Sequence, residues 1–345
     1  SFATKMLCAY YSRGCDSRDL FADLKIAEAA SFEQNLNQYD VIYLDITLFL
    51  STLKQSDMLV AQIEQEIIDD LAQSYPEIAV EHRLVDSLCK MNQITGRKLI
   101  LLIDEWDAMF RECKGADEIL DNYILLLRSL FKSSLTDQLF AGVYMTGILP
   151  IKKYGHESAV SDFYEYSMVE PRPLQEYIGF TTEEVKSLCQ KYDKDYTIMQ
   201  EWYDGYTVGG VHVYNPKSVM ESILRDKYSS YWTKTETYEA LRNYIDMNFD
   251  GLKDTVVDML GGEKCEVDTG SFQNDMTSMK SRDDVLTLLI HLGYLAYDED
   301  TRCVSIPNVE IREEFIRAIK NGNRTELMKA VLRSDSILQA TWEKD

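Results

Sequence analysis

The chain has 345 residues, of which 45% are hydrophobic and 27% charged, and its formal net charge is −22 at pH 7. This size and composition are typical of a globular protein with two or three domains. The strong negative charge disfavours nonspecific binding to nucleic acid or to an anionic membrane surface.

Seven cysteines are scattered along the chain without paired spacing. This pattern predicts neither a zinc site nor a disulfide framework, and it fits reduced thiols in the cytoplasm. No apolar run approaches the length of a membrane span. We therefore expect a cytoplasmic protein with no membrane partner.

The first half of the chain alternates between strand and helix patterns. Short apolar runs predict buried strands over Val41–Thr47 and Lys98–Asp104. A third strand that ends in a turn is predicted over Leu139–Gly147, with SMVEP (Ser167–Pro171) as a candidate fourth. Helical patterns occupy Phe2–Ser12, Asp19–Leu36, Gln55–Gln73, Val80–Met91 and Asp117–Phe131. The first of these is expected to carry one apolar stripe made of Phe2, Met6, Leu7, Tyr10 and Tyr11. Strands that alternate with helices predict an α/β fold with a mainly parallel sheet.

The composition changes at EPRPLQEYIGFT, which carries two prolines and a glycine, so we expect domains at 1–171 and 172–345. Strand pairs are predicted near Gly209–Tyr214 and Tyr294–Ile306. Helices are predicted over Thr182–Tyr192, Tyr196–Tyr203, Pro216–Tyr228, Thr235–Met247, Leu252–Leu260, Arg282–Leu292, Glu310–Asn321 and Arg324–Leu332. Helices followed by a hairpin indicate either a winged-helix-like module or a plain helical bundle with one hairpin.

LILLIDEWD (Leu99–Asp107) is the most informative stretch for chemistry. Five apolar residues lead to two adjacent carboxylates, Asp104 and Glu105, at the carboxyl end of a buried strand, where ligands bind in open α/β sheets. One interpretation is the Walker B element of a P-loop ATPase. Asp104 then holds Mg²⁺, and Glu105 accepts a proton from the water that attacks the γ-phosphate of ATP. The alternative is a strand that runs into an acidic loop.

A P-loop ATPase also needs a phosphate cradle, G-x-x-x-x-G-K-[ST], and the chain contains no such motif. The last residue of a cradle starts a helix upstream of Walker B, and Ser1 followed by a helical pattern fits that position. We therefore expect Ser1 to contact the phosphates and Mg²⁺. We also expect a strand and a Gly-Lys upstream of it, without which ATP binds poorly.

Two other polar residues are candidates for the same site. Thr146 ends the third predicted strand, where ATPases of this kind place a polar group near the γ-phosphate; the alternative is a cap or turn before Gly147. Arg172 lies between two prolines. One interpretation is that it senses the γ-phosphate or the lid, and the alternative is that it is a surface arginine in a linker. Asp45 lies beside Asp104 or caps a helix or turn.

The remaining motifs favour structural roles. WYDGYTVGGVHVYNPKSV (Trp202–Val219) predicts a tight aromatic corner, and Asn215–Pro216 predicts a helix N-cap followed by proline. The histidines are unclustered, so none is assigned to a metal or to catalysis: His82, His156, His212 and His291.

Eleven short stretches occur in order from Ser1 to about Ile311 and together resemble an AAA-ATPase-like family of bacterial proteins. They are SFATKMLCAYYSRGCDSRDLF, VIYLDIT, LLIDEWDAMF, YMTGILPIKK, ESAVSDFYEYSM, GFTTEEV, WYDGY, YNPKSV, YWTKT, LLIHLGYLAY and IPNVEI. The resemblance implies a P-loop ATPase domain, often fused to a C-terminal restriction-endonuclease-like nuclease domain. It places Ser1 on the cradle serine, Asp104 and Glu105 on Walker B, and Thr146 on the polar strand end. The absence of Gly-Lys and of a nuclease domain indicates truncation at both ends.

From these observations we expect a regulatory ATPase module in which ATP and Mg²⁺ bias a helical, winged-helix-like lid. Its output then goes to a C-terminal effector or a protein partner. Two alternatives stay open. One is a nucleotide sensor or scaffold that does not hydrolyse ATP. The other is a DNA-acting module accessory to a nuclease, although the net charge makes direct nucleic-acid binding unexpected.

Overall fold

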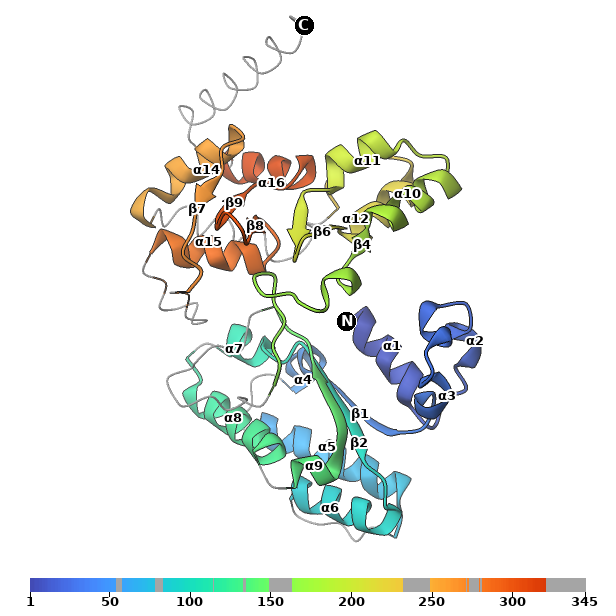
Figure 1. Ribbon diagram of the computed structural model, residues 1–345. Coiled ribbons are helices and arrows are strands. Elements are labelled where there is room, and N and C mark those ends of the chain that lie inside the picture. The colour runs from blue at the N-terminus through green and yellow to red at the C-terminus, as the bar shows by residue number, and fades with distance from the viewer. Residues whose placement is uncertain are drawn as a thin grey trace, which may run out of the picture. The chain divides into compact units, whose positions relative to one another are not determined.

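The computed structural model (Figure 1) describes residues 1–53, 58–77, 83–113, 115–132, 135–148, 163–231, 249–270, 272, 279 and 281–320. The chain divides into two compact units, Ser1–Phe163 and Tyr164–Asp345, which we describe separately. The helices predicted over Thr235–Met247 and Arg324–Leu332 lie outside the described residues, as do the first residues of those predicted from Gln55 and Val80. The predicted domain limits, 1–171 and 172–345, stay a prediction.

The described part of the first unit has a parallel sheet of three strands. These are β1 (Asp40–Asp45), β2 (Leu99–Asp104) and β3 (Phe140–Met145), in the order β1-β2-β3. The three predicted strands and the α/β class are therefore confirmed. Only β2 is buried throughout: β1 is mostly half-buried, and most residues of β3 are half-buried or exposed. Its helices are α1 (Phe2–Tyr11), α2 (Arg18–Phe21), η1 (Lys25–Glu28), α3 (Phe32–Asn35), α4 (Ile46–Leu53), α5 (Leu59–Ser74), α6 (Leu84–Thr95), α7 (Ala108–Glu112), α8 (Asp117–Phe131) and α9 (Thr136–Leu139).

The central strand β2 is buried along its whole length, which explains its continuous apolar sequence. Leu99, Leu101 and Ile103 point into the main core, which α4 to α8 complete. Side chains alternate between the faces of a strand, so Ile100 and Leu102 point to the other face. Helix α1 contacts β1 and β2 there (Figure 1).

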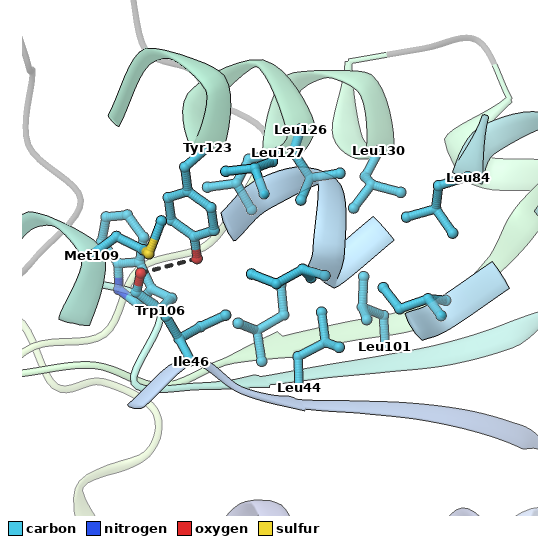
Figure 2. Close-up of a cluster of buried hydrophobic side chains, with 14 of the residues drawn as sticks. Leu44, Ile46, Leu84, Leu101, Trp106, Met109, Tyr123, Leu126, Leu127 and Leu130 are labelled. Atoms are coloured by element: carbon cyan, nitrogen blue, oxygen red, sulfur yellow. Dashed lines mark hydrogen bonds between the residues drawn. The ribbon is translucent and has the colours of Figure 1, made fainter. Parts of the chain in front are cut away.

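The main core reaches the carboxyl end of the sheet through Trp106 and Tyr123 (Figure 2). The Tyr123 hydroxyl donates a hydrogen bond of 3.0 Å to the backbone carbonyl of Trp106. Tyr123 is fully buried, so this bond satisfies a hydroxyl that burial would otherwise leave unpaired. Helix α8 is thereby attached to the loop that carries the acidic residues.

Three details differ from the sequence-based predictions. The first strand ends at Asp45, because the Asp45 carboxylate accepts the backbone N–H of Leu48 (3.1 Å) and caps α4. Ser167–Pro171 is not a strand, because the Ser167 hydroxyl accepts the N–H groups of Val169 and Glu170 and turns the chain. Phe2 is not part of a buried stripe: it is 80% exposed.

The described part of the second unit has two small antiparallel sheets, ordered β4-β6-β5 and β7-β9-β8. The strands are β4 (Phe180–Thr181), β5 (Tyr206–Val208), β6 (Val211–Tyr214), β7 (Cys265–Glu266), β8 (Ala296–Asp298) and β9 (Cys303–Ser305). The helices are η2 (Gln175–Tyr177), α10 (Thr182–Lys191), α11 (Tyr196–Tyr203), α12 (Pro216–Arg225), η3 (Phe249–Gly251), α14 (Leu252–Leu260), α15 (Arg282–His291) and α16 (Val309–Lys320). Both predicted hairpins are present, and β4 and β7 extend them.

Helix α15 lies between β7 and the β8–β9 hairpin in the chain, an order compatible with a winged-helix-like module. The assignment to that fold stays a proposal. Residues Val285 to Ile290 are all buried, so α15 is covered on every side.

None of the described helices is both long and apolar enough to cross a membrane.

Candidate functional site at the carboxyl edge of the parallel sheet

The carboxyl ends of the three parallel strands bring the acidic motif and Thr146 together. Asp45 is the register partner of Asp104 on the neighbouring strand. Thr146 follows β3, and its backbone is held by two hydrogen bonds of 2.9 Å, one to the carbonyl of Ile103 and one from the N–H of Trp106. The sheet edge predicted to bind a ligand is therefore built from the ends of β1, β2 and β3.

Asp104 is the buried centre of this edge, with only 1% of its surface exposed. Its carboxylate accepts a hydrogen bond from the Thr146 hydroxyl and another from the Tyr43 hydroxyl (3.3 Å), and it contacts the backbone nitrogen of Ser1. Burial of a carboxylate is costly without such partners. Polar groups from three separate segments thus hold Asp104 in place.

Ser1 is the N-cap of α1. Its side-chain oxygen accepts the backbone N–H of Thr4 (3.3 Å) and lies 2.6 Å from the Thr4 hydroxyl. The N-terminus of a helix favours negative charge because its N–H groups and dipole point outward. The helix predicted after Ser1 is confirmed, and its N-terminus lies against the carboxylate of Asp104.

Glu105 has an unusual backbone conformation for a residue other than glycine, with φ of +54°. Its carboxylate accepts a hydrogen bond of 2.6 Å from Nη2 of Arg111. Burial raises the pKa of Glu105; the charge of Arg111 opposes this rise and that of Asp107 adds to it. A carboxylate with a raised pKa at a sheet edge is a common feature of catalytic sites.

Asp107, Arg111 and Gly147 are part of the site but were not predicted from the sequence. Asp107 is 1% exposed and accepts hydrogen bonds from Nε of Arg111 (3.1 Å) and the backbone N–H of Ile148 (3.3 Å). A methyl group on Gly147 would lie 2.6 Å from Asp107 Oδ1 and from the Trp106 ring, so only glycine fits. The four-residue spacing of Asp107 and Arg111 was the one signal in the sequence.

The other predicted candidates lie elsewhere or serve another purpose. Asp45 adjoins Asp104 in the sheet, but its carboxylate caps α4. Arg172 belongs to the second unit, where it forms an exposed ion pair of 3.7 Å with Glu299, so its predicted sensor role stays a prediction.

The histidines do not form a metal site in the described part of the chain. Nδ1 of His212 lies 3.2 Å from Oδ1 of Asp204, and His291 is the last residue of α15. His82 and His156 lie outside the described residues. Among the residues that the structure describes, no three His, Cys, Asp or Glu side chains are grouped so as to hold a metal ion.

The WYDGY stretch packs two parts of the second unit together. The Tyr206 hydroxyl donates to the carbonyl of Gly293 (2.6 Å), and the Asn308 side chain donates to the carbonyl of Asp204 (2.8 Å). Asn215 caps α12, whose first residue is Pro216, as predicted. These contacts agree with the structural role preferred for this stretch.

The fold and the site define the class of the first unit: an α/β domain with a buried aspartate, a neighbouring glutamate and a helix N-terminus at the carboxyl edge of a parallel sheet. Residues 1–156 match the model of the family described as Predicted AAA-ATPase, which supports an AAA-ATPase-like character for this part of the chain. The match supports binding of nucleotide, and of ATP in general terms. No curated protein matches the chain.

Proposed function

We propose that this protein is a regulatory ATPase module that binds ATP with Mg²⁺ at the carboxyl edge of the β1-β2-β3 sheet. The observation that carries the proposal is the meeting of Ser1, Asp104, Glu105 and Thr146 at that edge, together with the family match of residues 1–156. Ligands of open α/β sheets bind at this edge.

The oxygen ligands present fit Mg²⁺. This ion is usually held by one or two carboxylates together with phosphate and water oxygens. The Asp104 carboxylate and the Ser1 hydroxyl would hold it, and the bound ion would neutralise charge on the phosphates. The buried position of Asp104, with hydroxyl groups of Tyr43 and Thr146 on its oxygens, keeps that carboxylate in one orientation.

In the proposed hydrolytic step, Glu105, Thr146 and Arg172 each have one role. The water oxygen forms a bond to the γ-phosphorus while the bond to the β,γ-bridging oxygen breaks, which leaves ADP and phosphate. Glu105 accepts the proton that the water loses. Thr146 and the N-terminus of α1 lie beside Asp104, in position to contact phosphate oxygens. Arg172 is proposed to sense the γ-phosphate or the lid.

The regulatory part of the proposal concerns the second unit. Nucleotide switches act through segments that change position or order when the γ-phosphate is lost. We assign that response to the second unit as a lid, with a C-terminal effector or a protein partner as the receiver.

A non-hydrolysing nucleotide sensor is the second candidate, and one observation favours it. An oxygen of Glu105 is paired with Arg111, and this cation opposes the rise that burial gives to the pKa of Glu105, which limits its strength as a base. The DNA-acting alternative has less support. Helix α15, the helix before the hairpin, is buried on every side, and the chain carries a charge of −22.

The test compares the full-length protein with its Glu105→Gln variant. We expect both to bind Mg²⁺-ATP with the same affinity in calorimetry, and the variant to release phosphate at least about a hundredfold more slowly, because it lacks the base. Glu118→Gln, on the exposed first turn of α8, is the control and should hydrolyse normally. Hydrolysis by Glu105→Gln at the control rate would contradict the role of Glu105. Binding without turnover in the unmodified protein would favour the sensor.

A further inference from the structure

We propose that Arg111 is a positioning residue that orients the carboxylate of Glu105, and that buried Asp107 fixes Arg111 to the end of β3. The inference rests on the proposed function, because it needs Glu105 to accept a proton from water. It adds a role for two residues that do not contact the phosphates in that proposal.

Arg111 bridges the two carboxylates with different nitrogens. Nη2 lies 2.6 Å from Glu105 Oε2, and Nε lies 3.1 Å from Asp107 Oδ2. A guanidinium group is planar and donates in fixed directions, so contact with one carboxylate determines where its other nitrogens point. The position of Asp107 therefore decides where Arg111 presents Nη2 to Glu105.

Asp107 is itself fixed by the chain that follows β3. It stands at the N-cap position of α7, but its carboxylate makes no capping bond there. Both of its oxygens instead lie 3.3 Å from the backbone nitrogen of Ile148. Gly147 packs so closely on Asp107 that a methyl group would not fit. Asp107 thus joins the loop after β3 to Arg111.

Glu105 needs an external partner because neighbouring charges repel its side chain. Asp107 and Asp45 both act on Glu105 as like charges, whereas Arg111 attracts it. The side chain is 34% exposed, so packing alone does not hold it in one rotamer. The left-handed backbone at Glu105 determines the direction in which its side chain leaves the chain, and the ion pair with Arg111 determines the position of its carboxylate.

The two acidic residues of the motif are therefore tied to the same short segment. Thr146 hydrogen-bonds to Asp104, and Ile148, two residues later, hydrogen-bonds to Asp107. A shift of this segment moves Asp104 directly and Glu105 through Asp107 and Arg111. A misplacement of about 1 Å in a catalytic group can cost a hundredfold in rate.

The experiment measures steady-state hydrolysis and nucleotide affinity in the full-length protein with Arg111→Met and Arg111→Lys. We expect Arg111→Met to lower kcat about 10- to 100-fold with the Kd for Mg²⁺-ATP changed less than about twofold. Arg111→Lys should recover part of kcat because it restores the charge without the planar fork. Arg83→Met, an exposed arginine before α6, is the matched control.

Two further variants separate positioning from a general loss of structure. Asp107→Asn should lower kcat as Arg111→Met does, and the double variant should be no worse than either alone. In the Glu105→Gln background, Arg111→Met should have no added effect on turnover. Without nucleotide, Arg111→Met should lower the urea midpoint of unfolding relative to Arg83→Met, because two carboxylates lose their cation.

The outcomes distinguish this inference from the proposed function. If Glu105→Gln abolishes turnover but Arg111→Met leaves kcat unchanged, raises it, or changes only the Kd, the positioning role is wrong and the proposed function stands. If Glu105→Gln itself retains full turnover, the proposed function fails first.

Discussion

Thr146 and Asp104, 42 residues apart in the chain, meet at the ends of adjacent parallel strands, where the Thr146 hydroxyl donates a hydrogen bond to the Asp104 carboxylate. Asp104 is almost completely buried, so this donor offsets part of the cost of removing a charge from water. The contact links the two residues that the sequence placed separately at strand ends.

Thr146→Ala should lower the free energy of unfolding by about 1–3 kcal/mol, because it leaves an oxygen of a buried carboxylate without its donor. Thr146→Ser keeps the hydroxyl and should lose much less. Urea unfolding of the nucleotide-free protein measures both. Equal stability of the alanine and serine variants would show that the hydrogen bond contributes nothing.

Asp104→Asn should preserve the fold and remove the metal dependence of nucleotide binding. Tyr43 and Thr146 donate to different oxygens of Asp104, so the amide keeps one acceptor for one hydroxyl, and its NH2 group can donate to the oxygen of the other. A neutral amide is a poor ligand for Mg²⁺. In calorimetry, the ratio of ATP affinities with and without Mg²⁺ should fall to about one. Asp70→Asn, on the exposed side of α5, is the control, and a variant that keeps its Mg²⁺ dependence would exclude Asp104 as a ligand.

Gly205→Ala should destabilise the second unit by about 2–5 kcal/mol. A methyl group at this position would lie 1.9 Å from the carbonyl oxygen of Pro307, and the backbone φ is +108°. Gly210→Ala is a matched control, because its φ is also positive, +86°, but the added methyl group meets open space. Its cost should be about 1 kcal/mol. Similar losses at both positions, measured by urea unfolding, would contradict the close packing on Pro307.

Alkylation with iodoacetamide should modify Cys15 first and Cys113 and Cys189 last. Cys15 is exposed, whereas the other two are buried, and burial raises the pKa of their thiols. The thiolate is the reactive form, so both effects slow the buried residues, by about tenfold or more relative to Cys15. Peptide mapping by mass spectrometry over time measures the order. Modification of Cys113 as early as Cys15 would show that the core around α7 opens readily.

The central strand and its acidic end were predictable from local pattern. LILLID is a short, uninterrupted apolar run, and such a run is stable as a strand only when both faces are covered, as they are in β2. The start of α12 at Asn215–Pro216 was predictable for the same reason, since an N-cap side chain and a first-turn proline act on backbone groups only a few residues away. Local chemistry was sufficient for these elements.

Boundaries and pairings between strands needed the tertiary structure. VIYLDIT reads as one strand because Ile46 and Thr47 favour extended backbone, yet the Asp45 cap and the buried position of Ile46 turn the chain into α4. The apolar stripe of α1 was predicted to include Phe2, but Phe2 is exposed, whereas Met6, Tyr10 and Tyr11 of that stripe pack into a small core. Propensity cannot show which side of a helix the rest of the chain covers.

At the site, too, the sequence predicted the candidate residues, and the tertiary structure decided their partners. Strand ends identify Asp104, Glu105 and Thr146 as candidates, because parallel strands bring their carboxyl ends to one edge. The partners that hold them were decided by the fold. Arg111 reaches Glu105 only because Glu105 adopts a left-handed backbone and Asp107 is held by Ile148 across the sheet edge. The contact between Asp107 and Ile148 joins residues 41 positions apart in the chain, and no local sequence pattern encodes a pairing of that kind.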